Sequence, residues 1–190
     1  MKVRFLFHTP LGERGVGKLI VGWTWLLGCF YNWKVLKYNF SHVEIWIPDE
    51  TGRFESLEFM TKKGIRRSYF GQCFSSTTRG DANGVRFAPA NKVLKHPERW
   101  EYIEVEVDPE RYEVELAEAK RLIGGRYDYG YILSFMQPFI IQSKFAWACS
   151  EICAWVGYLW GIIPKQFKRI SPRRLAYILA KKYGEPKPLV

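Results

Sequence analysis

The spacing of apolar residues predicts mainly strands in the first half of the chain and mainly helices in the second. Apolar residues recur at every second position in residues 3–7 and 43–47, a period of two that is typical of strands. The second segment ends at the turn sequence Pro-Asp-Glu-Thr-Gly, residues 48–52, and residues 53–60 resume the alternation. We therefore expect residues 43–47 and 53–60 to pair as an antiparallel hairpin.

Two further strands are predicted at residues 85–88 and 102–107, together with four helices. Helical spacing of apolar residues places the helices at about residues 18–27, 109–123, 148–162 and 172–182. Ser171 stands in the N-cap position of the last helix and Pro172 just inside it, a combination that is favoured at helix starts. The order of the elements predicts an α+β fold with an antiparallel sheet and helices towards both ends of the chain.

The composition is that of one compact domain spanning residues 1–190. The hydrophobic fraction is 47% and the aromatic fraction 17%, which is enough for a core without disulfide bonds. The 16 Gly and 10 Pro exclude a collagen-like or low-complexity chain. Four cysteines are too few for a disulfide scaffold, so we expect reduced thiols.

The net charge of +10 is concentrated near the C-terminus. Residues 161–190 contain eight basic residues and one acidic residue, whereas the rest of the chain is nearly balanced. A basic helix and tail from about residue 164 is either a solvated face or a surface for nucleic acid, anionic lipid or an anionic polymer. The charge therefore bears on docking and says little about chemistry.

The N-terminal region predicts neither a signal peptide nor a membrane-spanning helix. Residues 1–7 are too short for the apolar core of a signal peptide. Residues 19–36 are rich in aromatic side chains, but glycine and polar residues interrupt them, so they predict a buried or interfacial helix. We expect a cytoplasmic protein, with peripheral association with a membrane left open.

Cys149 is the most informative single residue. It stands where an apolar run meets the start of a predicted helix. The helix dipole and unpaired backbone N–H groups at such a position lower the pKa of a thiol and favour the thiolate. The same N–H groups can stabilise a developing oxyanion. Cys153 lies one turn further along, and for both residues the alternative is an ordinary buried core cysteine.

His42 is the candidate base. It alternates out of register with the apolar residues of its strand and shares a strand face with Glu44. An acidic or polar neighbour is needed to orient an imidazole. Glu55 and Glu58 on the next predicted strand point to opposite faces, so at most one of them can face His42. Alternation does not decide among Glu44, Glu55 and Glu58 without the strand register. The other histidines, His8 and His96, are expected to be less constrained.

Five short segments in this order resemble those of the circularly permuted NlpC-type papain-like cysteine hydrolases, especially the YiiX-like group. The resemblance covers about residues 17–179, nearly the whole chain. The matching segments are Ser41-His42 opening a strand, Glu58 followed by Gly64-Ile65, Gly-Gly-Arg-Tyr-Asp at residues 124–128, Cys-Ser-Glu at 149–151, and Ile-Ser-Pro-Arg-Arg-Leu at 170–175.

The resemblance implies a papain-like fold, an antiparallel sheet or small barrel packed against helices, in which the His strand precedes the Cys helix. Cys149 would then be the nucleophile, His42 the general base and Glu58 the orienting acid, with Tyr127 lining the site near the thiol. Glu44 remains a possible part of the site. The chemistry would be hydrolysis of an amide bond in a peptide or cell-wall fragment, without a metal or cofactor. Many members of the family are secreted or membrane-attached. The predicted lack of a signal peptide is a departure from that pattern.

Two alternatives use the same sequence differently. In the first, Cys149 and His42 act on a lipid ester, as in permuted relatives that resemble lecithin:retinol acyltransferase, while the aromatic segment 19–36 and the basic C-terminus hold the protein at a bilayer. In the second, the protein is a non-catalytic binding module whose basic terminus contacts nucleic acid or another anionic polymer, although no nucleic-acid motif is present.

Overall fold

The fold is taken from a computed structural model of the chain, which describes residues 1–10, 37–61, 64–78, 83–130, 146–164 and 170–190. For residues 56–66 the description covers the backbone of the strands. The predicted helix at residues 18–27, the whole aromatic segment 19–36 and Cys29 lie outside the described residues.

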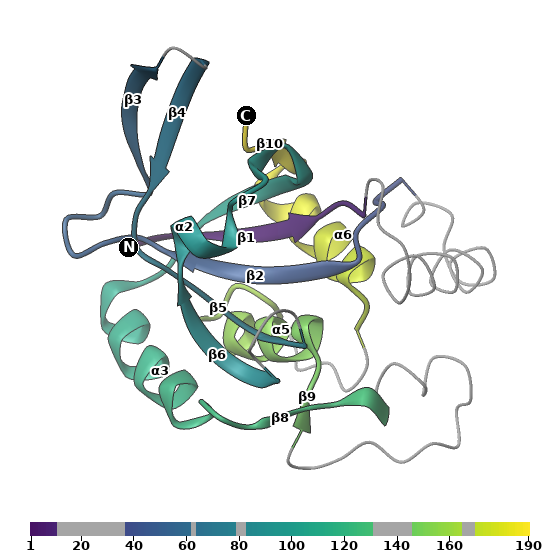
Figure 1. Ribbon diagram of the computed structural model, residues 1–190. Coiled ribbons are helices and arrows are strands. Elements are labelled where there is room, and N and C mark those ends of the chain that lie inside the picture. Colours follow the sequence, from purple (N-terminus) through teal and green to yellow (C-terminus); the bar gives the residue numbers. More distant parts are fainter. Residues whose placement is uncertain (11–36, 62–63, 79–82, 131–145, 165–169) are drawn as a thin grey trace.

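An antiparallel sheet of six strands forms the centre of the molecule, in the order β10-β7-β1-β2-β5-β6 (Figure 1). This confirms an α+β fold with an antiparallel sheet. Four of the predicted strands, around residues 3–7, 43–47, 85–88 and 102–107, are confirmed as β1, β2, β6 and β7. The strands of this sheet are β1 (Lys2–His8), β2 (His42–Ile47), β5 (Gln72–Thr77), β6 (Gly84–Pro89), β7 (Trp100–Glu106) and β10 (Lys187–Pro188).

The predicted hairpin between residues 43–47 and 53–60 is wrong. β2 pairs with β1 on one side and with β5 on the other. β3 (Glu55–Thr61) pairs instead with β4 (Gly64–Tyr69) in a separate two-stranded sheet that projects from the main one (Figure 1). Every residue of β2 is buried, and a strand in the middle of a sheet needs a partner along each edge. Alternation identifies a strand but does not say which strand lies beside it.

Three helices pack on one face of the sheet and enclose the larger hydrophobic core. They are α3 (Pro109–Arg121), α5 (Cys149–Leu159) and α6 (Pro172–Tyr183), all close to the predicted positions. The core combines apolar side chains from these helices with Val3, Phe5 and Phe7 of β1 and the apolar face of β2. α5 lies against β2 and β5, which places its first residue beside the beginning of β2.

A smaller core lies on the opposite face of the sheet. It contains Leu6, Trp46, Trp100 and Leu189, together with residues of the short helix α2 (Ala90–Val93). A short 3₁₀ helix, η2 (Pro97–Arg99), leads into β7. Two-residue strands β8 (Arg126–Tyr127) and β9 (Ala146–Trp147) pair in parallel at the start of α5.

The basic C-terminal segment is integrated in the fold where the structure describes it. Ser171 caps α6 as predicted, its hydroxyl accepting the N–H of Arg174. α6 buries Leu175 and Leu179 in the larger core, and β10 extends the main sheet beside β7. Lys181, Lys182 and Lys187 are exposed. No helix within the described ranges is sufficiently long and apolar to cross a membrane.

Candidate active site

The first turn of α5 holds Cys149 in a fixed position. Ala148 is extended and precedes the helix, and its N–H lies 3.4 Å from the carboxylate of Glu151. The hydroxyl of Ser150 donates a hydrogen bond of 2.6 Å to the carbonyl of Ile170, which ties the helix start to the segment before α6. Cys149 is the first helical residue, so its backbone N–H has no partner within the helix. This confirms the predicted setting of Cys149 at a helix start.

The thiol of Cys149 lies where β2 extends past its pairing with β5. The ladder between these strands covers Ile45 to Ile47. Two residues before it, the backbone of Val43 lies near the thiol of Cys149 and lowers its pKa, and the carbonyl of Val43 accepts the hydroxyl of Ser75 at 2.8 Å. Beyond the end of the ladder, the backbone of β2 is thus available to the thiol of Cys149.

His42 lies close enough to the thiol of Cys149 for each group to shift the pKa of the other. Its Nε2 lies 3.1 Å from Oε1 of Glu44 on the same strand, so the imidazole is held between a sulfur and a carboxylate. The edge of the ring also faces Trp100, with ring centroids 6.3 Å apart. The structure therefore brings together the two residues, Cys149 and His42, that the sequence predicts to act as nucleophile and base.

The charges of Cys149 and His42 stabilise each other. Burial raises the pKa of the Cys149 thiol, but the charge and hydrogen bond of His42, with the N–H groups of Val43 and Ser150, bring that pKa below its usual value. Burial lowers the pKa of His42, and the negative charges of Cys149 and Glu44 overcome this and raise it to about 9. Both shifts favour the thiolate–imidazolium pair over the neutral pair.

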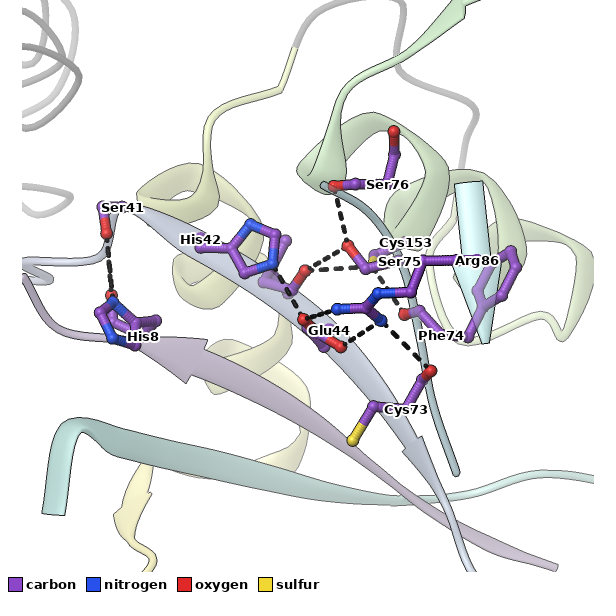
Figure 2. A network of polar contacts seen from close by, with 11 residues as sticks. His8, Ser41, His42, Glu44, Cys73, Phe74, Ser75, Ser76, Arg86 and Cys153 are labelled. Carbon is purple, nitrogen blue, oxygen red and sulfur yellow. Dashed lines mark hydrogen bonds and ion pairs between the residues drawn. The ribbon is translucent and has the colours of Figure 1, made fainter. Parts of the chain in front are cut away.

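Glu44 is buried and fully ionised. Burial raises the pKa of its carboxyl group, and the hydrogen bonds from His42 and Arg86 outweigh this and lower it to about 2. Arg86 on β6 donates to both carboxylate oxygens, at 2.9 and 2.7 Å, and also lies 3.4 Å from the carbonyl of Cys73 (Figure 2). A buried carboxylate is stable when it is paired and hydrogen-bonded in this way.

Of the three acids considered from the sequence, the structure places Glu44 against His42. Glu55 forms an ion pair of 2.6 Å with Arg4 on β1. Glu58 belongs to β3, which does not lie beside β2, so the premise that placed it opposite His42 is wrong. The side chain of Glu58 is outside the description, and its role stays a prediction.

Tyr127 is near the site in the backbone register. It stands opposite Trp147 in the β8–β9 pair, and Trp147 is two residues before Cys149. The ring centroids of Tyr127 and Tyr129 lie 5.2 Å apart. Glu151, on the first turn of α5, is partly buried, and burial together with the charge of Asp128 raises its pKa to about 7. That Tyr127 lines the site stays a prediction.

Two charged or titratable residues near the site were not singled out from the sequence. Arg86 lies between Val85 and Phe87 in a predicted strand, and a charge inside an apolar strand is the signal that would have identified it. His8, expected to be less constrained, is buried; it is the cross-strand partner of His42, and its Nδ1 lies 3.4 Å from the hydroxyl of Ser41. His8 directly follows apolar Phe7, and His42 directly precedes apolar Val43. Each histidine therefore falls outside the alternating apolar positions of its strand.

The remaining described cysteines have no comparable setting. Cys73 and Cys153 are free and buried, and burial raises their pKa values well above the usual range. The Sγ of Cys153 faces the carbonyls of Val43 and Phe74 at 3.7 and 3.9 Å. In the part of the chain that the structure describes, no group of three or more His, Cys, Asp and Glu side chains is arranged to hold a metal ion.

The site combines a thiol at a helix start, an imidazole beside it and a buried carboxylate behind the imidazole. Such a group of residues can supply a sulfur nucleophile and a proton donor within one hydrogen-bonded chain. Comparison with family models, curated proteins and solved structures found no match to this chain.

Proposed function

We propose that the protein is a cysteine hydrolase that cleaves an amide bond in a peptide or cell-wall peptide through a thioacyl-enzyme intermediate. The observation that carries the proposal is the placement of His42 between the Cys149 thiol, whose pKa it lowers, and the Glu44 carboxylate, which lies 3.1 Å from its Nε2. The amide substrate class follows from the resemblance to permuted papain-like hydrolases.

In the acylation step, the Cys149 thiolate attacks the carbonyl carbon of the amide, and a C–S bond forms. The His42 imidazolium gives its proton to the nitrogen of the leaving amine as the C–N bond breaks. Because Glu44 holds Nε2, the other ring nitrogen, Nδ1, serves the thiol and the leaving group. The backbone N–H of Cys149 at the start of α5 supports the oxyanion of the tetrahedral intermediate.

In the deacylation step, neutral His42 takes a proton from water, whose oxygen attacks the thioester. The C–S bond breaks, the carboxylic acid leaves, and His42 regains the imidazolium that pairs with the released thiolate. Glu44 stays ionised throughout and stabilises the imidazolium, as the carboxylate does in other triads. The nearly complete burial of the three side chains strengthens these interactions by excluding bulk water.

Of the two alternative functions, the lipid acyl hydrolase or acyltransferase uses the same chemistry and the binding module involves no catalysis. A thiolate of this kind also attacks esters, so a lipid acyl hydrolase or acyltransferase would use the same residues. The aromatic segment invoked for membrane contact lies outside the described residues. The binding module has the exposed Lys181 and Lys182 available, but the buried group of Cys149, His42 and Glu44 has no role in it.

Site-specific alkylation tests the proposal without a known substrate. Iodoacetamide labelling across about pH 5 to 9, read for each cysteine by mass spectrometry, should show that Cys149 reacts fastest at pH 6. His42→Ala should slow Cys149 at that pH by about tenfold or more, since the thiol loses the charge that lowers its pKa. Cys153→Ala is the matched control on the same helix and should leave the labelling of Cys149 unchanged. Equal reactivity of all cysteines would overturn the proposal.

A substrate screen then separates the classes of bond. Peptide and cell-wall peptide libraries, acyl esters and phospholipid vesicles are incubated with the wild-type protein and with Cys149→Ala. Cleavage of peptides that is lost in Cys149→Ala supports the amidase. Cleavage confined to acyl esters or lipids would replace it with the lipid version.

A further inference from the structure

We propose that Arg86 is a positioning residue that acts on Cys149 through Glu44 and His42, which extends the proposed triad by a fourth member on β6. The inference rests on the proposed function, since it assigns the residue that orients the acid of that site.

The geometry of the Arg86 guanidinium fixes the rotation of the Glu44 carboxylate. Its Nη2 lies 2.7 Å from Oε1 and its Nη1 2.9 Å from Oε2. Such a two-point contact is geometrically specific because a planar fork meets a planar carboxylate. Oε1 is also the oxygen that faces Nε2 of His42 at 3.1 Å. Arg86 therefore determines which oxygen is directed at the imidazole (Figure 2).

The guanidinium is itself held in place. Arg86 stands opposite Ser75 in the pairing of β6 with β5, and its Nη1 also lies 3.4 Å from the backbone carbonyl of Cys73 on β5. Its side chain is 19% exposed, whereas that of Glu44 is 2% exposed. A partly buried arginine that contacts one buried carboxylate and one strand carbonyl has little freedom to take another position.

The charges around Glu44 explain why Arg86 matters for the thiol. His42 faces the carboxylate from β2, Arg86 faces it from β6, and the thiols of Cys73 on β5 and Cys153 on α5 stay neutral because burial raises their pKa values. Without Arg86, Glu44 would keep a single charged partner, so its carboxylate would be harder to ionise and less firmly oriented. His42 would then lose part of the oriented contact with Oε1 that stabilises its protonated form.

Alkylation of Cys149 in Arg86 variants tests this inference. Arg86→Met keeps most of the length and removes the charge; we expect Cys149 to be alkylated about tenfold more slowly at pH 6, because raising the thiol pKa by one leaves a tenth of the thiolate. Arg86→Lys keeps the charge but cannot make the two-point contact, so its rate should fall between those of wild type and Arg86→Met. If Arg86→Met does not fold, Arg86→Lys still tests the inference, because the alkylation rate of its Cys149 should remain below that of wild type.

Arg4→Met is the matched control. Arg4 on β1 is also partly buried and also contacts two carboxylate oxygens, those of Glu55 at 2.6 Å and Glu104 at 3.0 Å. Its loss should lower the melting temperature, as the loss of Arg86 does, without moving the pH profile of Cys149. A merely structural role for Arg86 predicts the same behaviour for both variants.

A double-variant cycle shows whether Arg86 acts through Glu44. In a Glu44→Gln background, Arg86→Met should have little further effect on the alkylation rate, because the group that it orients is already uncharged. Fully additive effects would overturn the inference. An alkylation profile of Arg86→Met that matches wild type, in a folded protein, would also overturn it.

The pKa of His42, measured from its ring nitrogens by ¹⁵N NMR, separates this inference from the proposed function. Arg86→Met should lower that pKa whether or not Cys149 is a nucleophile. If Cys149 is not the most reactive cysteine in the wild-type protein, the proposed function fails, while an unchanged His42 pKa in Arg86→Met would reject the role of Arg86.

Discussion

At the scale of single residues, the environment of Glu44 decides which acid serves His42. Glu44 is two positions from His42 on one strand, so both side chains lie on the same face. Its carboxylate contacts His42 at 3.1 Å and Arg86 at 2.7 Å. The carboxylate of Glu55 forms an ion pair with Arg4 instead. Glu58 belongs to β3, which lies in another sheet. The hydrogen bonds from His42 and Arg86 together let the carboxylate of Glu44 remain charged in this buried position.

Replacement of Glu44 tests this assignment. Glu44→Gln keeps the shape of the side chain but removes the negative charge, so the His42 imidazolium loses stabilisation and the thiol pKa of Cys149 rises. We expect alkylation of Cys149 at pH 6 to slow by about ten- to a hundredfold, which corresponds to a rise of the pKa by one or two. Glu58→Gln and Glu55→Gln are the controls, and their Cys149 should be alkylated at the wild-type rate. A slower alkylation confined to Glu58→Gln would restore Glu58 as the orienting acid.

The pH dependence of hydrolysis and of alkylation follows from the directions of the pKa shifts of Cys149 and His42. Thiolate is lost as pH falls through the lowered pKa of Cys149, and the imidazolium is lost as pH rises through the raised pKa of His42, about 9. Hydrolysis needs both, so its rate should be bell-shaped with an alkaline limb near pH 9. Alkylation needs only the thiolate, so it should show the acid limb and no decline near pH 9. A decline of both rates at the same alkaline pH would contradict the assigned role of His42.

At the scale of elements, the site depends on how short segments meet at the edges of the sheet. β8 is held next to β6 by two backbone hydrogen bonds: Val85 N–H donates to the carbonyl of Gly125 at 2.8 Å, and Gly124 N–H donates to the carbonyl of Val85 at 3.0 Å. β8 then pairs with β9, which leads directly into Cys149. The junction of β6 and β8 therefore helps to position the start of α5.

Gly84 at this junction gives a test at the same scale. It has φ of +128°, and a Cβ there would lie 2.0 Å from the carbonyl oxygen of Gly125. Gly124, with φ of +83°, has open space at the same position. Gly124→Ala should cost about 1 kcal/mol of unfolding free energy from backbone strain, and Gly84→Ala about 2 kcal/mol more from the clash. Urea unfolding of both variants measures the difference, and equal costs would show that β8 does not approach β6 this closely.

At the scale of the whole molecule, the site lies between the two hydrophobic cores. Cys149 belongs to the core beneath α3, α5 and α6, whereas Trp100, whose ring faces His42 and His8, belongs to the core on the opposite face of the sheet. The C-terminal strand closes this second core: β10 pairs with β7, Leu189 N–H donates to the carbonyl of Trp100 at 3.0 Å, and the side chain of Leu189 is buried.

Truncation of Leu189 tests this closure. Leu189→Ala removes a side chain that is 3% exposed and should lower the free energy of unfolding by about 2 to 5 kcal/mol. Val190→Ala, one residue further and 54% exposed, should change it by less than about 0.5 kcal/mol. Thermal unfolding by circular dichroism compares the two variants. Equal melting temperatures would mean that the C-terminal strand does not contribute to the fold.

The sequence by itself was sufficient for those features that depend on local spacing. Alternation identified β1 and β2, and the sequence also predicted strands at β6 and β7. Helical periodicity with Ser171 and Pro172 identified α6, and the apolar run before Cys149 located the start of α5. Cys149 and His42 were found in this way because a helix start and a strand face are local properties.

Only the tertiary structure decided the features that depend on which strands lie side by side. It moved β3 out of the main sheet, placed β1 and β5 beside β2, and brought Arg86 from β6 onto Glu44. Strand pairing is set by burial on both faces and by contacts between residues that are distant in the sequence, and neither is contained in the period of a single strand. The choice of Glu44 as the acid beside His42 follows from that pairing.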